Sequence, residues 1–338
     1  MLKVFTDYAE RRGIDLDEEP DVLNDELPDA IHIEPALGKT VLREDLPKLF
    51  SDPGAPAWYA SRKLDGVRCL ILVDVTIEEQ EHRPRAEIKV ARAKAYSRSG
   101  KAFHTLQPLL DDIKRALEGW PHVTYLLEGE PPITEEINDV KWMRGNVITT
   151  KRFVLDGELC VMRKSEEHGG VMIEDFKGVV GKVRRKSGIA EDVRMFLLDF
   201  IPWSNFERSF NGADDFRPAY KTFDDRHQDV VDILHRMEEV TLEGEEHSLR
   251  YLPQQVISSM AEVDVMIEEA AEEGWEGFIL RRDVAYEGKR SSVETAVRAR
   301  IIFVGLILNL SDRADPTSVN TRNGSTQSIL SQMSKSTL

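Results

Sequence analysis

The chain of 338 residues is 41% hydrophobic and 31% charged, and its 45 basic and 61 acidic side chains give a net charge of −16. This composition indicates a globular protein with ample material for a core, and no stretch reaches the roughly 18–20 apolar residues that a membrane span needs. The negative charge argues against a protein that coats nucleic acid through its overall field.

Charge is segregated along the chain. Acidic residues concentrate at 15–26 and 224–273, whereas basic residues cluster at 83–101, 177–186 and 281–300. This distribution predicts one basic working face and an acidic back. Because the N-terminal residues lack the apolar core of a secretory signal, we expect an intracellular protein, nuclear in a eukaryote and cytoplasmic elsewhere.

The expected elements begin after an acidic, proline-containing segment at 1–50, whose weak periodicity predicts a loosely structured lead-in. Five β-rich runs follow, at 67–77, 86–97, 153–163, 194–203 and 276–282. Three windows have helical periodicity, at 106–118, 222–239 and 255–273. This order is neither a strict β-α-β alternation nor an all-β run, so the sequence predicts an α+β fold with antiparallel sheets.

The end of the chain has a different composition. An apolar run covers 301–310, and residues 311–338 are rich in Ser, Thr and Asn and contain no aromatic residue. We therefore expect a disordered tail, with 301–338 forming no further domain. The central segment 51–300 is expected to be the functional domain.

One segment carries a candidate nucleophile. In ASRKLDGVRC, residues 60–69, Lys63, Asp65 and Arg68 stand at the mouth of an apolar strand. A tight turn at Gly66 would present the lysine at the strand edge. Nearby cations or desolvation favour the neutral amine, which attacks phosphorus or carbonyl centres. Taken alone, the segment is equally compatible with a charged surface turn.

Later strands repeat this pattern of a charge at the edge of an apolar run. YSRSGK contains Arg98, VLDGELCV contains Glu158, and GWEGFILRR contains Glu276. A charge in such a place is costly unless it is paired or liganded, so these strands predict one polar cleft lined by sheet ends. Glu130, in LLEGEPP, has a sequence context similar to that of Glu158 in VLDGELCV, but the prolines that follow Glu130 indicate a loop.

In this order the motifs resemble those of the covalent nucleotidyltransferases, which comprise ATP-dependent DNA ligases, RNA ligases and mRNA capping enzymes. The sequences SRSG and LDGELCV are most similar to the corresponding motifs of the DNA ligase branch, and the match runs over roughly residues 55–300. The resemblance implies two antiparallel β-sheets flanked by helices that enclose a nucleotide cleft, in an ATP-grasp-like nucleotidyltransferase core.

The resemblance also implies a reaction and roles for its residues. Lys63 would attack the α-phosphate of ATP, and the AMP would pass to a 5′-phosphate before a 3′-hydroxyl seals a DNA nick. Arg68 and Arg98 would contact ribose and phosphates, with Arg98 also near the nucleic acid. Glu158 would bind ribose or metal and Glu276 would help hold a divalent metal, for which Mg²⁺ suits carboxylate ligands. Asp65 belongs to the nucleotide-binding motif.

Two positions depart from the family pattern. The aromatic residue that stacks on adenine is replaced by Leu198, and strict alternation would put Phe196 and Phe200 on one face. We assign the stacking role to Phe200, which adjoins the Asp of this strand. The final K-x-K pair, which grips the triphosphate, is replaced by Arg298 and Arg300, which keep the charge but not the compact ammonium. The usual oligonucleotide-binding barrel is not recognisable beyond them.

The leading interpretation is an ATP-dependent DNA ligase that acts on nicked double-stranded DNA as a monomer, away from membranes, in replication, repair or recombination. An RNA ligase or a GTP-using mRNA capping enzyme remains an alternative, because these enzymes share the chemistry. A relative that binds nucleotide or nucleic acid without forming a covalent adduct is the third interpretation.

Overall fold

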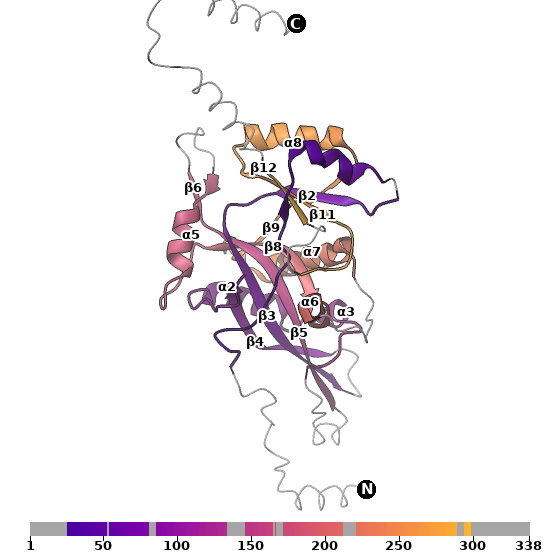
Figure 1. Ribbon diagram of the computed structural model, residues 1–338. Coiled ribbons are helices and arrows are strands. Elements are labelled where there is room, and N and C mark those ends of the chain that lie inside the picture. The colour runs from indigo at the N-terminus through magenta and orange to yellow at the C-terminus, as the bar shows by residue number, and fades with distance from the viewer. Residues whose placement is uncertain are drawn as a thin grey trace, which may run out of the picture.

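Two five-stranded β-sheets with helices on their outer faces form the framework of the protein (Figure 1). The computed structural model describes residues 26–52, 54–80, 86–133, 146–164, 166, 172–211, 221–288 and 294–298. Within these ranges the α+β fold and the two helix-flanked sheets predicted from the sequence are confirmed. Among the same residues, no helix is both long and apolar enough to cross a membrane.

The long-stranded sheet contains four of the five predicted strands. Its order is β4 (Glu87–Ser97), β3 (Val67–Gln80), β5 (Asn146–Cys160), β8 (Arg194–Pro202) and β9 (Leu249–Tyr251). All neighbours are antiparallel except β8 and β9, which run parallel. The run VRCLILVDV is apolar on both sides because both faces of β3 are covered by other elements.

Two helices cover one face of the long-stranded sheet. These are α2 (Gln107–Leu117) and α7 (Phe223–Val240), and both contribute apolar side chains to the largest core cluster. Residues of β3 at alternate positions, such as Ile71 and Val73, point into the same cluster. The start of α7 is set by a capping box in which Thr222 and Asp225 satisfy each other's backbone N–H groups.

The opposite face of this sheet is covered by the N-terminal part of the described chain and by α6 (Trp203–Asn211). Leu27 and Ile33 pack there with Leu70 and Leu72 of β3. Glu130 caps α6, since its carboxylate accepts the backbone N–H and the hydroxyl of Ser204 at 2.6 and 2.7 Å. The interpretation of Glu130 as a loop residue outside the motif set is consistent with this capping role.

The short-stranded sheet lies above the first and has its own helices. Its order is β1 (Lys39–Thr40), β12 (Glu294–Arg298), β11 (Gly277–Arg282), β2 (Trp58–Arg62) and β10 (Gln255–Ile257), with only β1 and β12 parallel. The 3-10 helix η1 (Arg43–Phe50) and α8 (Met260–Glu272) cover one face of it (Figure 1).

Two sequence-based expectations about elements are corrected by the fold. The expected lead-in at 1–50 is ordered in its described part, because β1 joins the short-stranded sheet and Leu46 of η1 is fully buried. The expected helix at 255–273 starts with a strand, β10, and α8 begins only at Met260, where Ser259 and Glu262 form a capping box in the first turn. The segments 1–25 and 299–338, with the expected tail, lie outside the described residues.

Smaller elements lie between consecutive strands of the long-stranded sheet. The hairpin of β6 (Met162–Lys164) and β7 (Met172–Glu174) follows β5 and leads directly into α5 (Phe176–Val183), at the left edge of Figure 1. The short helix α3 (Val123–Leu126) follows α2. Val179 and Val183 anchor α5 in the core beneath the long-stranded sheet.

Candidate active site

Lys63 lies in the short connection between β2 of one sheet and β3 of the other. Its backbone N–H donates to the carbonyl of Gly277 at 2.8 Å, which prolongs the pairing of β2 with β11. The turn then passes close to β5 at Gly66, where a Cβ atom would lie 2.4 Å from the carbonyl oxygen of Leu159. Only glycine lets the chain approach β5 this closely, so Gly66 places the lysine between the sheets.

The Lys63 side chain forms an ion pair with Glu276, the residue just before β11. The ammonium nitrogen contacts Glu276 Oε2, and both side chains are about one quarter exposed. The two residues are 213 positions apart in sequence. Pairing of β2 with β11 therefore brings the candidate nucleophile to this carboxylate.

Arg68 enters the same region from the start of β3. Its guanidinium donates to both carboxylate oxygens of Asp156, at 2.5 and 2.6 Å. Asp156 is completely buried, so this two-point contact compensates its charge and orients the guanidinium. No role was assigned to Asp156 from the sequence, although its position two residues before Glu158, on the same strand face, was a signal for one.

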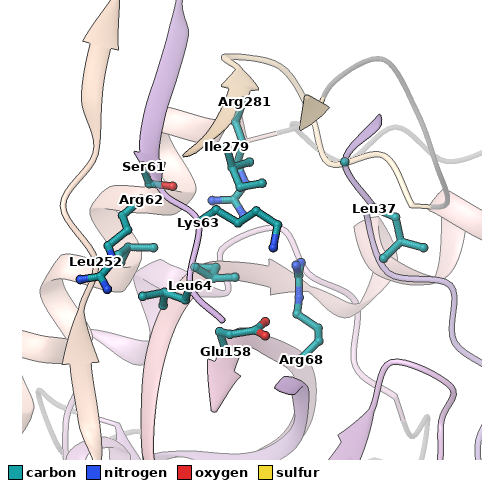
Figure 2. A pocket seen from close by; sticks show the side chains of 12 residues that line it. Leu37, Ser61, Arg62, Lys63, Leu64, Arg68, Glu158, Leu252, Ile279 and Arg281 are labelled. Carbon is teal, nitrogen blue, oxygen red and sulfur yellow. The ribbon is translucent and has the colours of Figure 1, made fainter. Parts of the chain in front are cut away.

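Glu158 stands opposite Arg68 in the β3–β5 pair. Burial raises the pKa of Glu158 to about 7, Arg68 acts against this shift, and Asp156 adds to it. Among the described residues, no hydrogen bond reaches the Glu158 carboxylate, so it is available to a ligand. Figure 2 shows Lys63 and Arg68 pointing toward each other, with the Glu158 carboxylate beside them.

These side chains line a pocket of about 180 Å³ between the sheets. Its charged lining consists of four cations and one carboxylate, namely Arg62, Lys63, Arg68, Arg281 and Glu158. A pocket with this balance is suited to an anion, although the whole chain carries a net charge of −16. Local arrangement of charge, and not the total, decides what this site attracts.

The apolar lining of the pocket includes Leu198 from β8 and Ile279 from β11, so each sheet provides an aliphatic side chain. The assignment of Phe200 to base stacking is wrong in this structure. Phe200 is fully buried in the core on the other face of the sheet, against Phe153 with 4.8 Å between ring centroids.

A β-bulge explains this correction. Asp156 of β5 pairs with Asp199, but Gly157 pairs with Leu197, so Leu198 is an extra residue in β8. The bulge reverses the alternation, and Phe196 and Phe200 point to opposite faces. Gly157 permits it, because a Cβ atom there would lie 2.6 Å from the carbonyl oxygen of Phe196.

The remaining predicted residues lie around the pocket or outside it. Asp65 is exposed in the turn after Lys63, and Arg98 is exposed in the turn after β4, so neither lines the pocket. In the β11–β12 pair, Arg298 stands opposite Gly277, and Gly277 directly follows Glu276. Arg300 lies outside the described residues.

Arg281 is a pocket residue that the sequence reasoning missed. It is 4% exposed and projects from β11 on the same side as Ile279, two residues earlier (Figure 2). Its guanidinium also lies over the ring of Phe223, 5.5 Å from the centroid. Alternation along EGFILRR would have pointed to it, since residues at 279 and 281 share a strand face.

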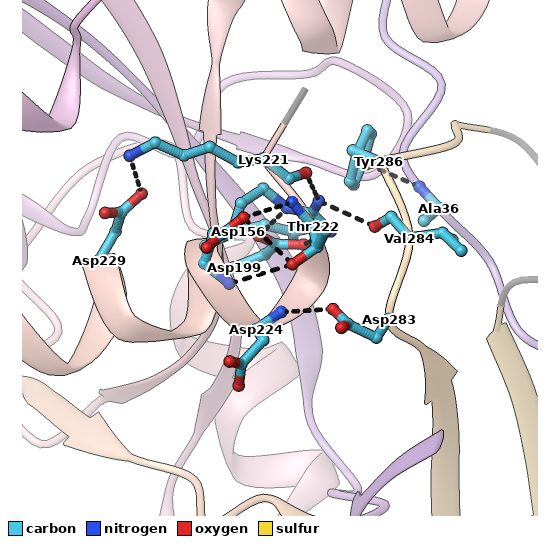
Figure 3. A network of polar contacts seen from close by, with 12 residues as sticks. Ala36, Asp156, Asp199, Lys221, Thr222, Asp224, Asp229, Asp283, Val284 and Tyr286 are labelled. Carbon is cyan, nitrogen blue, oxygen red and sulfur yellow. Dashed lines mark hydrogen bonds and ion pairs between the residues drawn. The ribbon is translucent and has the colours of Figure 1, made fainter. Parts of the chain in front are cut away.

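A polar network at the junction of the sheets holds the two walls of the cleft together (Figure 3). Arg226 of α7 donates to both carboxylate oxygens of Asp199 in β8, at 2.8 and 3.2 Å, and to the carbonyl of Val284 beyond β11 at 3.2 Å. The hydroxyl of Tyr286 accepts the backbone N–H of Ala36 at 2.8 Å. Both sheets are therefore tied to one buried guanidinium.

A second cavity of about 340 Å³ adjoins the pocket. The two share Ser61, Arg62, Leu64 and Leu252, while the second cavity is lined further by apolar residues that include Trp275. Arg62 forms a 2.7 Å ion pair with Glu174 there. The Lys63 loop is thus bordered by open space on two sides.

The two carboxylates expected to hold Mg²⁺ occupy different situations. The Glu158 carboxylate accepts no hydrogen bond from a described residue, and a cation would favour its ionised form, whereas Glu276 already contacts Lys63. No group of three or more His, Cys, Asp or Glu suited to a metal is present in the described part of the chain. Mg²⁺ is commonly held by one or two carboxylates together with substrate phosphates, and Glu158 fits that role.

Comparisons with known proteins give similarity at the level of the fold. No protein-family model matches the chain, and no curated protein matches it. Among solved structures, one named "Pmar-Lig_Pre." has a TM-score of 0.48 and 19% identity over 79% of this chain and 46% of that chain. The ATP-dependent DNA ligase of bacteriophage T7 in complex with ATP has a TM-score of 0.44 and 17% identity over 78% and 68%.

A third solved structure, the Chlorella virus DNA ligase–adenylate, has a TM-score of 0.40 and 17% identity over 79% of this chain and 69% of that chain. The chain is thus similar, over most of its length, to ATP-dependent DNA ligases. It spans less than half of the length of the first of these structures.

Proposed function

We propose that the protein is an ATP-dependent polynucleotide ligase that forms a lysine–AMP intermediate and seals nicks in double-stranded DNA. The observation that supports this proposal is the convergence of motif residues from both sheets on one pocket. Lys63 and Glu276 meet between the sheets, and Arg68, Glu158 and Arg281 line the same space. A nucleophilic amine among fixed cations is what attack on a phosphate ester requires.

In the first step Lys63 Nζ attacks the α-phosphorus of ATP. The N–P bond forms as the bond from phosphorus to the bridging oxygen breaks, and pyrophosphate leaves. The ammonium must first lose a proton, and the Glu276 carboxylate is in contact with it and is placed to receive that proton. Arg68 and Arg281 line the pocket where negative charge develops on the phosphate oxygens.

Two further steps complete the reaction. A 5′-phosphate oxygen of the nicked strand attacks the adenylyl phosphorus, the N–P bond breaks, and the lysine regains a proton. The 3′-hydroxyl of the adjacent strand then attacks the 5′-phosphate, the phosphodiester forms, and AMP leaves. Bound Mg²⁺ would neutralise phosphate charge as the amine approaches, with Glu158 as the residue of this chain that holds it.

The apolar lining supports a nucleotide as the ligand. Leu198 and Ile279 present aliphatic surfaces from opposite sheets, between which a planar base has apolar contact on both faces. Glu158 adjoins this space and offers a carboxylate to a ribose hydroxyl. The base, the sugar and the phosphates would therefore meet different side chains of one pocket.

Self-labelling tests the proposal. The protein is incubated with [α-³²P]ATP and Mg²⁺, denatured, and examined for a label that survives alkali and is released by acidic hydroxylamine, as a P–N bond requires. We expect labelling that Lys63→Ala abolishes and that Lys48→Ala, an exposed lysine on η1, preserves. Parallel reactions with [α-³²P]GTP distinguish a capping enzyme from a ligase.

Failure of the proposal would be unambiguous. Folded protein that takes no label from ATP or GTP is not a covalent nucleotidyltransferase. Labelled protein is then given a nicked duplex and, separately, a nicked RNA duplex, and the sealed product is measured. If only the nicked RNA duplex were sealed, the substrate would be RNA and not DNA.

A further inference from the structure

A cluster of exposed basic residues surrounds α5, on the flank of the protein next to the Lys63 loop. Residues 176–190 contain five basic and no acidic side chains, in a chain whose net charge is −16. Four of them, Lys177, Arg184, Arg185 and Lys186, are exposed and form no ion pair with any described residue. We call these four residues the α5 basic patch.

The α5 basic patch is attached to the candidate active site through short contacts. Arg62, the residue before Lys63, pairs with Glu174 at the end of β7. The next residue, Asp175, caps α5 by accepting the N–H of Gly178 at 2.9 Å, and its own N–H donates to the carbonyl of Val161 at 2.7 Å. The position of α5 is therefore fixed relative to the lysine loop.

The far end of α5 meets a second basic segment. The hydroxyl of Thr105 donates to the carbonyl of Lys182 at 3.4 Å, and the N–H of Ala190 donates to the carbonyl of Thr105 at 2.9 Å. Thr105 closely follows the turn after β4, where Arg98 and Lys101 are exposed. The exposed cations thus continue from α5 toward the end of β4.

We propose that the α5 basic patch binds the sugar–phosphate backbone of the polynucleotide substrate beside the site of ligation. This inference rests on the proposed function and identifies the surface that would hold its second substrate. The eight residues of α5 cover about 12 Å and separate Lys177, near the start of the helix, from Arg184, Arg185 and Lys186 just after its end, a span that matches three to four phosphates of one strand at about 3.4 Å each. Unpaired cations on an acidic protein favour a polyanion locally.

The packing of α5 argues against a helix that lies in a membrane surface, although Phe176 at its start and Ile189 beyond its end are exposed. Such a helix must turn its apolar side outward, but Val179 and Val183 are buried in the core. One acidic neighbour, Asp192, is already paired with Lys182, and Glu191 is exposed beside it. The acidic helix α8 lies on the other sheet, at the top of Figure 1, away from the patch.

The test compares two triple variants with the same change in net charge. The first, Arg184→Glu/Arg185→Glu/Lys186→Glu, reverses the patch. The control, Lys48→Glu/Lys89→Glu/Lys114→Glu, reverses three exposed lysines on η1, β4 and α2. Binding of a fluorescein-labelled nicked 24-mer duplex is followed by anisotropy from 50 to 200 mM NaCl, and self-labelling with ATP, which needs no DNA, is measured in parallel.

We expect the patch variant to bind the duplex at least tenfold more weakly and to lower the slope of log K against log salt by about 2–3, since each lost phosphate contact removes about 0.9. The control variant should remain within about threefold of the wild type and keep its slope. An alanine triple at the same positions should give an intermediate loss without the repulsion of glutamates.

The two proposals fail in different ways. Equal slopes for the patch variant and the wild type, or no duplex binding by the wild type, overturn the role of the patch even when Lys63 is labelled. Loss of binding specific to the patch variant supports that role, and absence of label in the same preparation overturns the ligase chemistry alone.

Discussion

The Nζ atom of Lys63 contacts the carboxylate of Glu276, which lies 213 residues further along the chain, just before strand β11. Nothing local determines this contact. It exists because β2 and β11 are neighbours in the short-stranded sheet, with the Lys63 N–H bonded to Gly277. The contact puts a proton acceptor on the candidate nucleophile before any substrate arrives, which leads to the first prediction.

Replacing Glu276 by Gln should slow self-labelling about 10²-fold, because the amide neither accepts the proton nor holds the ammonium by charge. The labelling rate of Glu276→Asp should lie between those of the wild type and Glu276→Gln, since aspartate keeps the charge but has a shorter side chain. Single-turnover labelling at several pH values measures the effect. Rates within threefold of the wild type for Glu276→Gln would remove Glu276 from the chemistry.

Glu158 should make stability depend on pH. Burial raises its pKa from 4.5 to about 7, so between these values the folded protein keeps a proton that the unfolded chain has lost. The free energy of unfolding therefore falls as pH rises through this window. At pH 8, the free energy of unfolding of Glu158→Gln should exceed that of the wild type by about 1–3 kcal/mol. At pH 4 the two proteins should be about equally stable in this respect.

Urea unfolding of both proteins at pH 4, 6 and 8 checks this, with Glu128→Gln, an exposed carboxyl, as the control. The measurement needs no activity. A difference between Glu158→Gln and the wild type that stays constant across the three pH values would mean that Glu158 ionises normally in the folded protein.

Leu198 and Phe200 should give separable effects because they occupy opposite faces of β8. Phe200→Ala removes a ring from the core and should lower the free energy of unfolding by about 3–5 kcal/mol. Leu198→Ala should mainly weaken ATP binding, about tenfold, by removing one apolar wall of the pocket. Chemical unfolding and nucleotide titration of each variant measure the two effects. If Phe200→Ala weakened ATP binding more than Leu198→Ala, the bulge would not place Leu198 in the pocket and Phe200 in the core.

The Arg68–Asp156 pair should matter to both stability and nucleotide binding. Asp156→Asn leaves the guanidinium beside a neutral amide in a buried place and should cost about 3 kcal/mol of unfolding free energy. Arg68→Lys keeps the charge but loses the two-point contact. A double-mutant cycle on unfolding measures the coupling, and a coupling below about 0.5 kcal/mol would show that the two residues act independently.

Sequence patterns predicted the elements that depend on local periodicity. The apolar runs that became β3, β4, β5, β8 and β11 were recognisable, as were α2 and α7, because their buried positions recur with the period of a strand or a helix. The short strands β1, β2 and β10 were missed. They are two to five residues long and their pairing partners are distant in sequence, so no local pattern marks them.

The chain by itself determined which groups can do chemistry: Lys63 before a glycine turn, and Glu158 and Glu276 at the edges of apolar strands, where an uncompensated charge is costly. Only the tertiary structure decided what each of them meets. Strand pairing joined Lys63 to Glu276, and the bulge at Leu198 turned Phe200 into the core. Long-range pairing and bulges depend on the sum of contacts over a whole sheet, and periodicity along one strand does not encode them.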